Sequence, residues 1–259
     1  AIGEAPLDAF DVIEDLRMEG FGLFQVFTAR SLWGAGAEAW PAQVASTTFV
    51  VDALLAHWRR TGLPRFTQFD TAVRFQGGLH PPDVLGRVIR LCLSLEVRPV
   101  FAPPLEMGFQ AVIENFNGLW QRKVWQRSHH ETLPALTAAS QRFTAAYRKH
   151  LASRDEVSSL RRPFPSAWRL DWQQPPHGCV VHVRRTTENG TRKLRGHPWG
   201  NDRLWGHRPF RCDVALVSHV IRFYRLRRHE PAQQPLLNTL PYQFPARPFD
   251  TRQRHKHPV

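Results

Sequence analysis

The chain has 259 residues, 42% of them hydrophobic, which is enough for one or two domains with a buried core and excludes an intrinsically disordered protein. Its formal net charge of +13 favours a polyanionic partner. The three cysteines have no CxxC spacing, the N-terminus lacks the apolar core of a signal peptide, and no apolar run is long enough to span a membrane. We therefore expect a cytoplasmic protein with no disulfide framework and no membrane partner.

Strands are expected first along the chain. Segments 7–17, 23–29 and 37–42 carry the apolar, β-branched and aromatic residues typical of strands. The glycines of the MEGFG sequence between the first two segments can form a tight turn, so these two strands are predicted to make a hairpin.

Helices and strands then alternate. Apolar residues at helical spacing or short apolar runs predict a helix at 46–60, a strand at 65–70, a helix capped by Asp83, a strand at 97–102, a helix at 109–127 and a polar helix at 130–160. Three strands followed by this alternation indicate a mixed α/β fold, with a five-stranded mixed sheet flanked by helices.

The pattern changes after a proline-rich break at 161–168. Short strands are expected at 168–172, 179–186, 191–196, 210–217 and 220–227. The Asn189-Gly190 pair predicts a hairpin turn between the second and third of them. Five short strands in succession are typical of a small all-β barrel.

These patterns divide the chain into four parts. We expect a core at 1–150, a linker at 151–167, a small DNA-binding β-barrel at 168–230, and a basic, proline-rich tail at 231–259 that is extended or disordered. Charge follows the same division: residues 1–150 hold 15 Lys and Arg against 14 Asp and Glu, whereas residues 151–259 hold 20 against 8. This asymmetry favours chemistry in the first part and phosphate binding in the second.

Two acids occupy positions that suit a ligand site. Asp70 stands at the carboxyl end of a predicted strand, where α/β folds place their ligands. Glu114 lies one turn into a predicted helix and off its apolar stripe. Taken alone, each of them is better explained as a solvated surface carboxylate.

A third acid would be needed to hold two hard cations through oxygen ligands. Asp11 is in the middle of the apolar part of the first strand, where a carboxylate needs a metal or another partner to offset its desolvation. Asp15, at the end of the same strand, is the alternative.

Four stretches carry a resemblance to a known family: FDVIEDL, WRRTGLPRFTQFD, RLCLSLEVRPVFAPP, and GFQAVIENFN before a basic helix. They resemble the catalytic core of the DDE transposases and retroviral-type integrases of bacterial insertion sequences, which have an RNase H-like fold. The resemblance covers roughly residues 7–150, and the last stretch is its most specific part. The later strands resemble the small SH3-like barrel that often follows this core.

The resemblance implies a two-metal polynucleotidyl transferase. Asp70 and Glu114 match the second and third catalytic acids of the family, and Asp11 best matches the first. These acids would hold two magnesium or manganese ions for phosphodiester cleavage and strand transfer in DNA integration or transposition. The implied partners are DNA, as element ends and as target, and further copies of the chain on that DNA, in a bacterial cytoplasm at the nucleoid.

Basic side chains that suit DNA phosphates occur in two groups. One group extends the helix that starts near Glu114, and the other surrounds the expected hairpin turn. They are Arg122, Lys123, Arg127, Arg184, Arg185, Arg192, Lys193 and Arg195. Any single one of them is equally well explained as part of a solvated face.

Two features depart from the pattern of the family. Thr71, Ala72 and Val73 follow Asp70, where members usually carry Asn, and the 44-residue interval from Asp70 to Glu114 is wider than in retroviral integrases. Two alternatives therefore stand beside an active transposase. One is a catalytically decayed remnant that binds DNA, and the other is an RNase H-like nuclease with another class of substrate.

Overall fold

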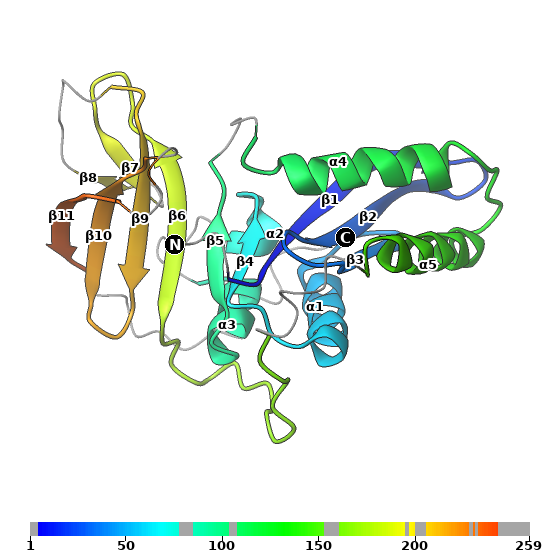
Figure 1. Cartoon of the computed structure of the whole chain (residues 1–259), viewed down its shortest axis with the longest axis horizontal. Coiled ribbons are helices and arrows are strands. Elements are labelled where there is room, and N and C mark those ends of the chain that lie inside the picture. Colours follow the sequence, from blue (N-terminus) through cyan, green and yellow to red (C-terminus); the bar gives the residue numbers. More distant parts are fainter. Residues whose placement is uncertain are drawn as a thin grey trace.

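The computed structural model describes residues 5–77, 85–103, 108–152, 161–194, 197–199, 206–227, 230 and 233–242 (Figure 1). A mixed β-sheet with helices on both faces organises these residues. The mixed α/β class predicted from the sequence is confirmed. No helix in the described part of the chain has the length and apolar character to cross a membrane.

The first half of the chain forms one end of the sheet and the helices that cover it. Its elements are β1 (Leu7–Met18), β2 (Gly22–Ser31), β3 (Ala37–Ala42), α1 (Thr47–Thr61), β4 (Phe66–Phe69), α2 (Val73–Gln76), α3 (Arg87–Ser94), β5 (Arg98–Phe101), α4 (Ala111–Trp120), a π-helical turn η2 (Gln121–Trp125) and α5 (Leu133–His150). The predicted strands and helices are all present, within a few residues for most of them. The short helix α2 was not predicted, and the expected cap at Asp83 lies outside the described residues.

Five strands in the order β5-β4-β1-β2-β3 make the predicted mixed sheet. Strands β1, β2 and β3 are antiparallel neighbours, whereas β4 runs parallel to β1 and β5 runs parallel to β4. This arrangement puts β1 at the centre, with the carboxyl end of β4 beside its middle.

Two apolar layers cover the opposite faces of this sheet. On the α4 face, α4 and α5 pack on β1, β2 and β3 through a cluster that includes Ala9, Ile13, Phe116, Trp120 and Leu136. On the α1 face, α1 and α3 pack through Phe10, Leu54, Trp58, Ile89 and Phe69. Because successive residues of a strand point to opposite faces, odd-numbered residues of β1 up to Ile13 belong to the α4 face.

Local sequence explains where α1 begins and ends. The Ser46 hydroxyl accepts a hydrogen bond from the Phe49 amide at 3.2 Å, as expected of an N-cap. Gly62 ends the helix with a φ of 78°, which a residue with a Cβ rarely adopts, and its amide donates to Trp58.

The second half of the chain continues the same sheet. Its strands are β6 (Cys179–Arg185), β7 (Arg192–Leu194), β8 (His197–Trp199), β9 (Pro209–Ala215), β10 (Val220–Arg225) and β11 (Leu236–Pro241). Strand β6 pairs with β5 in parallel, and β9, β10 and β11 follow in antiparallel order to give nine strands. The closed SH3-like barrel and the domain boundaries stay predictions.

Two predictions in this half are wrong. Residues 168–172 form no strand; instead, Trp168, Leu170 and Trp172 pack as an irregular segment against the core. The turn at Asn189-Gly190 is present, with the Gly190 amide donating to Thr187 at 2.9 Å. It does not join β6 to β7 as a hairpin, because both edges of β6 are occupied by β5 and β9, and β7 pairs with β8.

Part of the expected linker is bound to the core. Leu63 and Arg162 exchange backbone hydrogen bonds of 2.7 and 3.1 Å, and the Arg162 guanidinium contacts Glu96 at 2.6 Å. The Arg161 side chain reaches the fully buried Asp8 of β1 with two hydrogen bonds, one of them 3.0 Å long. Of the expected tail, Leu236–Pro241 form β11.

Candidate active site

Asp11 lies on the α4 face in the middle of β1 and is partly buried. Its Oδ1 accepts a 2.8 Å hydrogen bond from the Val12 amide, and its Oδ2 accepts one of 2.8 Å from the Asn117 amide of α4. The strand and the helix therefore fix this carboxylate from two sides.

Asn117 connects Asp11 to the next strand. Its side chain is 8% exposed, and its Oδ1 accepts a 2.8 Å hydrogen bond from the Thr28 hydroxyl of β2. Asn117 and Thr28 are members of this hydrogen-bonded group that were not selected from the sequence. The available signal was the spacing of Glu114 and Asn117, because residues three apart on a helix share a side.

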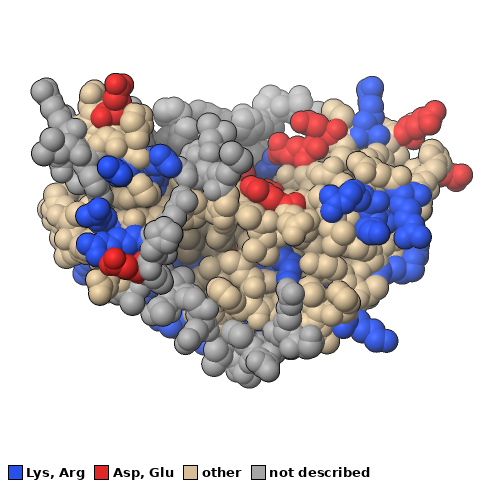
Figure 2. All heavy atoms as spheres, turned by 45° about the horizontal axis from the view of Figure 1, so that its top comes forward, with Lys and Arg blue, Asp and Glu red and all other residues tan. Residues whose placement is uncertain are grey.

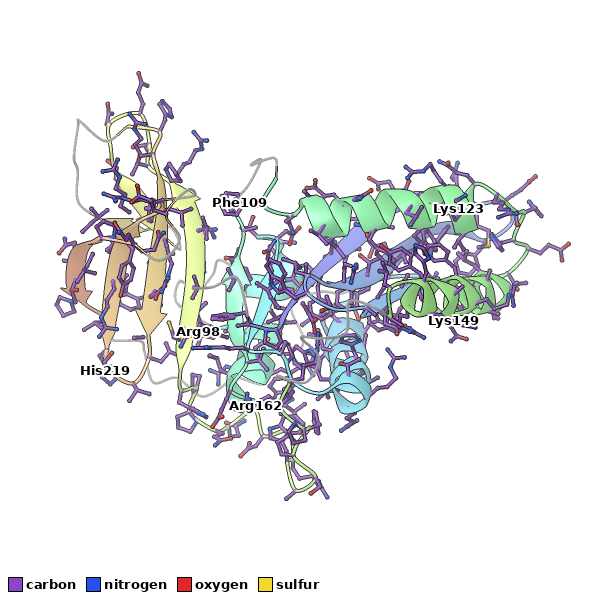
Figure 3. All side chains as sticks on the ribbon, viewed as in Figure 1. Arg98, Phe109, Lys123, Lys149, Arg162 and His219 are labelled. Atoms are coloured by element: carbon purple, nitrogen blue, oxygen red, sulfur yellow. The ribbon has the colours of Figure 1, made fainter. Side chains whose placement is uncertain are left out.

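Asp70 directly follows β4 and is partly buried. Its Oδ1 accepts a 2.8 Å hydrogen bond from the Ala72 amide, which fixes the carboxylate over the turn into α2. Burial raises the pKa of Asp70, and the bond from Ala72 lowers it in part. Two residues before Asp70, the Gln68 side chain donates a 2.7 Å hydrogen bond to the Phe109 carbonyl and connects β4 to the segment just before α4 (Figure 3).

Glu114 is in the first turn of α4, where a negative charge is favoured by the helix dipole. Its side chain is exposed, so it can change rotamer without disturbing the core.

The other two predicted acids, Asp70 and Glu114, both influence the ionisation of Asp11. Desolvation is the largest influence on this carboxyl group, and the negative charges of Asp70 and Glu114 act in the same direction. Together they raise the pKa of Asp11 to about 6, against the opposing hydrogen bonds from Val12 and Asn117. At this position the charges of two nearby acids therefore add to the desolvation that disfavours ionisation of Asp11.

As the side chains stand, no three His, Cys, Asp or Glu groups in the described ranges come close enough to form a metal cage. The donor set nevertheless suits a hard divalent cation, because it consists of carboxylate oxygens on a partly desolvated surface. A cation would also relieve the repulsion that raises the pKa of Asp11. The alternative first acid, Asp15, is exposed in a bulge of β1 with a φ of 57°.

Arg74 of α2 is a cation beside these acids that sequence reasoning missed. Its guanidinium forms an ion pair with Glu14 and donates to the Gln25 side chain at 3.2 Å and to the Ala45 carbonyl at 3.3 Å. Burial lowers the pKa of Arg74, and the charge of Asp11 raises it. Arg74 is therefore a positive charge near Asp11 that the protein itself holds in place.

The predicted DNA contacts beyond α4 are exposed. Arg122 and Lys123 are in η2, and Arg127 follows it. The helical rise places Lys123 about 14 Å from Glu114 along the helix axis (Figure 3). These three side chains remain candidates for phosphate contacts at a distance from the acids.

Near the expected hairpin, the predicted DNA contacts Arg184 and Arg185 are hydrogen-bonded to the protein itself. The Arg184 guanidinium donates to the Ala102 and Val183 carbonyls at 3.3 and 2.8 Å, and desolvation lowers its pKa to about 10. This side chain is hydrogen-bonded within the protein, and its contact with DNA stays a prediction. Arg185 is exposed and donates to His207 at 3.0 Å. The side chains of Arg192 and Lys193, and all of Arg195, lie outside the described part of the chain.

Comparisons with known proteins give structural similarities only. No family model and no curated protein matches the chain. A chain of the simian T-cell lymphotropic virus intasome, solved in complex with the PP2A regulatory subunit B56 gamma, matches 80% of this chain and 68% of its own length, with 14% identity and a TM-score of 0.46.

The catalytic core domain of BIV integrase matches 51% of this chain and 79% of its own length, with 18% identity and a TM-score of 0.40. Such low scores and identities carry no argument about chemistry, which has to come from the side chains of the site.

Proposed function

We propose that this chain is a DNA transposase or integrase core with an RNase H-like fold, which cleaves DNA and transfers strands with two magnesium or manganese ions. Asp11, Asp70 and Glu114 would be the ligands of these ions. The observation that carries the proposal is the arrangement of the acids on adjoining elements: Asp11 is on β1, Asp70 follows the parallel neighbour β4, and Glu114 is on α4, whose Asn117 bonds to Asp11. The charges of Asp70 and Glu114 add to the desolvation that raises the pKa of Asp11.

The position of the acids in the sheet also supports the proposal. Asp11 is on the central strand, Asp70 follows the neighbouring parallel strand, and Glu114 is on a helix that packs over β1 and β2. Three separate elements therefore carry one acid each, and the charges of Asp70 and Glu114 both act on Asp11. The resemblance of the surrounding sequence to DDE transposases assigns the same three residues.

The side chains of the site have distinct tasks. Asn117 and the Val12 amide hold Asp11 in one orientation, and the Ala72 amide holds Asp70. Glu114 is exposed and can complete the donor set when substrate arrives. When bound, two divalent cations would activate the attacking hydroxyl and stabilise the leaving oxygen of an in-line displacement.

The residues after Asp70 do not remove this chemistry. The bond to Asp70 comes from the backbone amide of Ala72, and any residue except proline can provide it. The departure from the family's usual Asn therefore leaves the orientation of Asp70 intact.

The test is cleavage and strand transfer on duplex DNA ends with magnesium or manganese. Glu114→Gln keeps the size of the side chain and removes its charge, and it should lower the rate by about 100-fold or more. Glu131→Gln is a matched control, because Glu131 is another exposed acid, located between η2 and α5. Full activity of Glu114→Gln would overturn the assignment of Glu114.

A catalytically decayed DNA-binding remnant is the second candidate. It is favoured by the lack of a ready metal cage among the described residues. Wild-type protein that binds DNA with a steep salt dependence and never cleaves it with either metal would establish this alternative. On both candidates the partners are DNA and other copies of the chain, and the place of action is the bacterial nucleoid.

A further inference from the structure

The α4 face of the sheet continues past the acids onto the second half of the chain. A cross-strand row on this face runs through paired residues of β1, β4, β5, β6, β9 and β10, which are Ala9, Gln68, Val100, Val181, Asp213 and Arg222. Asp11 and Asp70 stand two residues further along β1 and β4, on the same face. The acids and the second half of the chain therefore share one continuous surface.

Among the described residues, helices cover this face at one end. Figure 1 shows α4 and α5 beside β1, β2 and β3, while β6, β9 and β10 stand at the other end of the sheet. On the opposite face of these strands, Phe210, Cys212 and Phe223 are fully buried. Their neighbours on the α4 face remain partly exposed, as Arg211, Arg222 and Tyr224 show.

Arginines line the open part of the α4 face. We call Arg98, Arg211 and Arg222 the arginine face; they come from β5, β9 and β10. All three guanidinium groups are near enough to Cys179 of β6 for their charges to lower the pKa of its thiol. Burial and, to a smaller extent, the charge of Asp213 outweigh them and raise this pKa to about 11. Figure 3 shows Arg98 near the junction of β5 and β6.

The arginine face carries an excess of positive charge. Arg211 is neutralised by Asp213, which it contacts with two hydrogen bonds. Arg98 and Arg222 have no carboxylate within ion-pair distance among the described residues. Arg98 and Arg65 each lie 5.5 Å from the centre of the Phe66 ring, so two cations flank one aromatic side chain. A polyanion is the partner that such a surface fits.

We propose that the arginine face is a binding surface for duplex DNA, which crosses it toward Asp11 and Asp70, with Arg98 and Arg222 as phosphate contacts. The inference rests on the proposed function for the direction of the DNA. Figure 2 shows acidic side chains near the middle of the view, with basic side chains on either side of them.

The size of the surface fits a short duplex. Four strand spacings separate β4, which Asp70 follows, from β10, which carries Arg222. At about 4.8 Å for each spacing this is about 19 Å. Successive phosphates of one DNA strand advance about 3.4 Å along the helix axis, so the path accommodates about six of them.

The test is the affinity for a generic DNA duplex, measured by fluorescence anisotropy at several salt concentrations and without divalent metal. Arg98→Gln with Arg222→Gln should weaken binding about tenfold or more at 0.1 M salt and reduce the salt slope by about 2. Arg225→Gln is the matched control, because Arg225 is exposed on β10 but belongs to the opposite face, and it should leave the slope unchanged.

A second variant protects the test against misfolding. Val220→Glu adds a negative charge at a partly exposed position of the same face and keeps both arginines, and it should also weaken binding several-fold. An unchanged slope in the double variant, an equal loss in Arg225→Gln, or tighter binding of duplex RNA than of DNA would overturn the proposal. The assay contains no metal, so a failure to cleave DNA in the other experiment leaves its result intact.

Discussion

Two aspartates three residues apart on β1 have opposite electrostatic environments. Burial alone would raise the pKa of both. Asp8 faces α1 and is fully buried, but hydrogen bonds and charge from His57 and Arg161 hold the pKa of its carboxyl far below the usual range. Asp11 faces α4, and the nearby charges of Asp70 and Glu114 raise its pKa to about 6.

The difference separates a structural acid from a candidate functional one. The negative charge of Asp8 is matched by a guanidinium that fastens the segment after α5 to the core. Asp11 forms no ion pair with a described residue: the charge of Arg74 acts on it, but Arg74 is itself paired with Glu14. Two hydrogen bonds hold the Asp11 side chain in place. A carboxylate that is rigid and uncompensated suits the binding of a cation from outside the protein.

The largest effect on stability is expected when the charge of Asp8, the structural acid, is removed. Asp8→Asn leaves Arg161 buried without its counter-charge, so the free energy of unfolding at pH 7.5 should fall by about 3–5 kcal/mol. Urea denaturation of wild type and variant measures the difference. Because the folded-state pKa of Asp8 is depressed, its contribution is present above the unfolded pKa of about 4 and is lost as pH falls below it. A variant as stable as wild type at pH 7.5 would contradict the structural role of Asp8.

Removing the charge of Asp11 should change stability in the opposite direction and increase the free energy of unfolding. Its folded-state pKa is raised, so the protonated form is favoured in the native state and stability is lost as pH rises from about 4 through about 6. Asp11→Asn should therefore stabilise the metal-free protein at pH 7.5 by about 1–3 kcal/mol, the upper limit being the full pKa shift. The gain should vanish below pH about 4, where Asp11 is protonated in both states. Denaturation in EDTA at both pH values measures it, and a loss of stability at pH 7.5 would contradict an uncompensated site.

Divalent cations should produce a smaller change. With a dissociation constant of about 1 mM, about 10 mM magnesium would stabilise the wild type by about 1.4 kcal/mol. The increase in thermal midpoint should disappear in Asp11→Asn and in Glu114→Gln. Asp8→Asn should keep it, since Asp8 lies on the other face of β1. A magnesium effect of equal size in Asp11→Asn would place the cation elsewhere.

The smallest effect is expected at Asn117. Asn117→Ala removes a hydrogen bond that lowers the pKa of Asp11, so this pKa should rise further. The free energy of unfolding should fall by about 1 kcal/mol. The pKa of Asp11 can be measured by following carboxyl ¹³C chemical shifts from about pH 3 to about pH 9. A pKa of Asp11 that falls in the variant would contradict its positioning by Asn117.

Local patterns were sufficient to predict the first half of the fold. The hydroxyl of Ser46, the glycine at position 62 and apolar residues at helical spacing define α1 without reference to the rest of the chain. The same holds for Asp70 after a short strand and Glu114 near a helix start, which is why these acids could be selected from the sequence.

Long-range partners could not be predicted in this way. The pairing of β6 with β5 brings Val181 beside Val100, far away in the sequence, and no residue of β6 marks this partner. The contact of Arg161 with Asp8 joins residues 153 positions apart. Asn117 was visible as a polar helical residue, but its bond to Asp11 depends on how α4 packs on β1.

The most direct test of the central claim compares the two aspartates in one assay, the metal-dependent cleavage rate of DNA ends under single-turnover conditions. The temperature is chosen so that Asp8→Asn and Asp11→Asn are both folded by circular dichroism. We predict that Asp8→Asn, although less stable, cleaves at a rate near that of wild type, and that Asp11→Asn, although more stable, is slower by about 100-fold or more. Cleavage by Asp11→Asn at the wild-type rate would contradict the account.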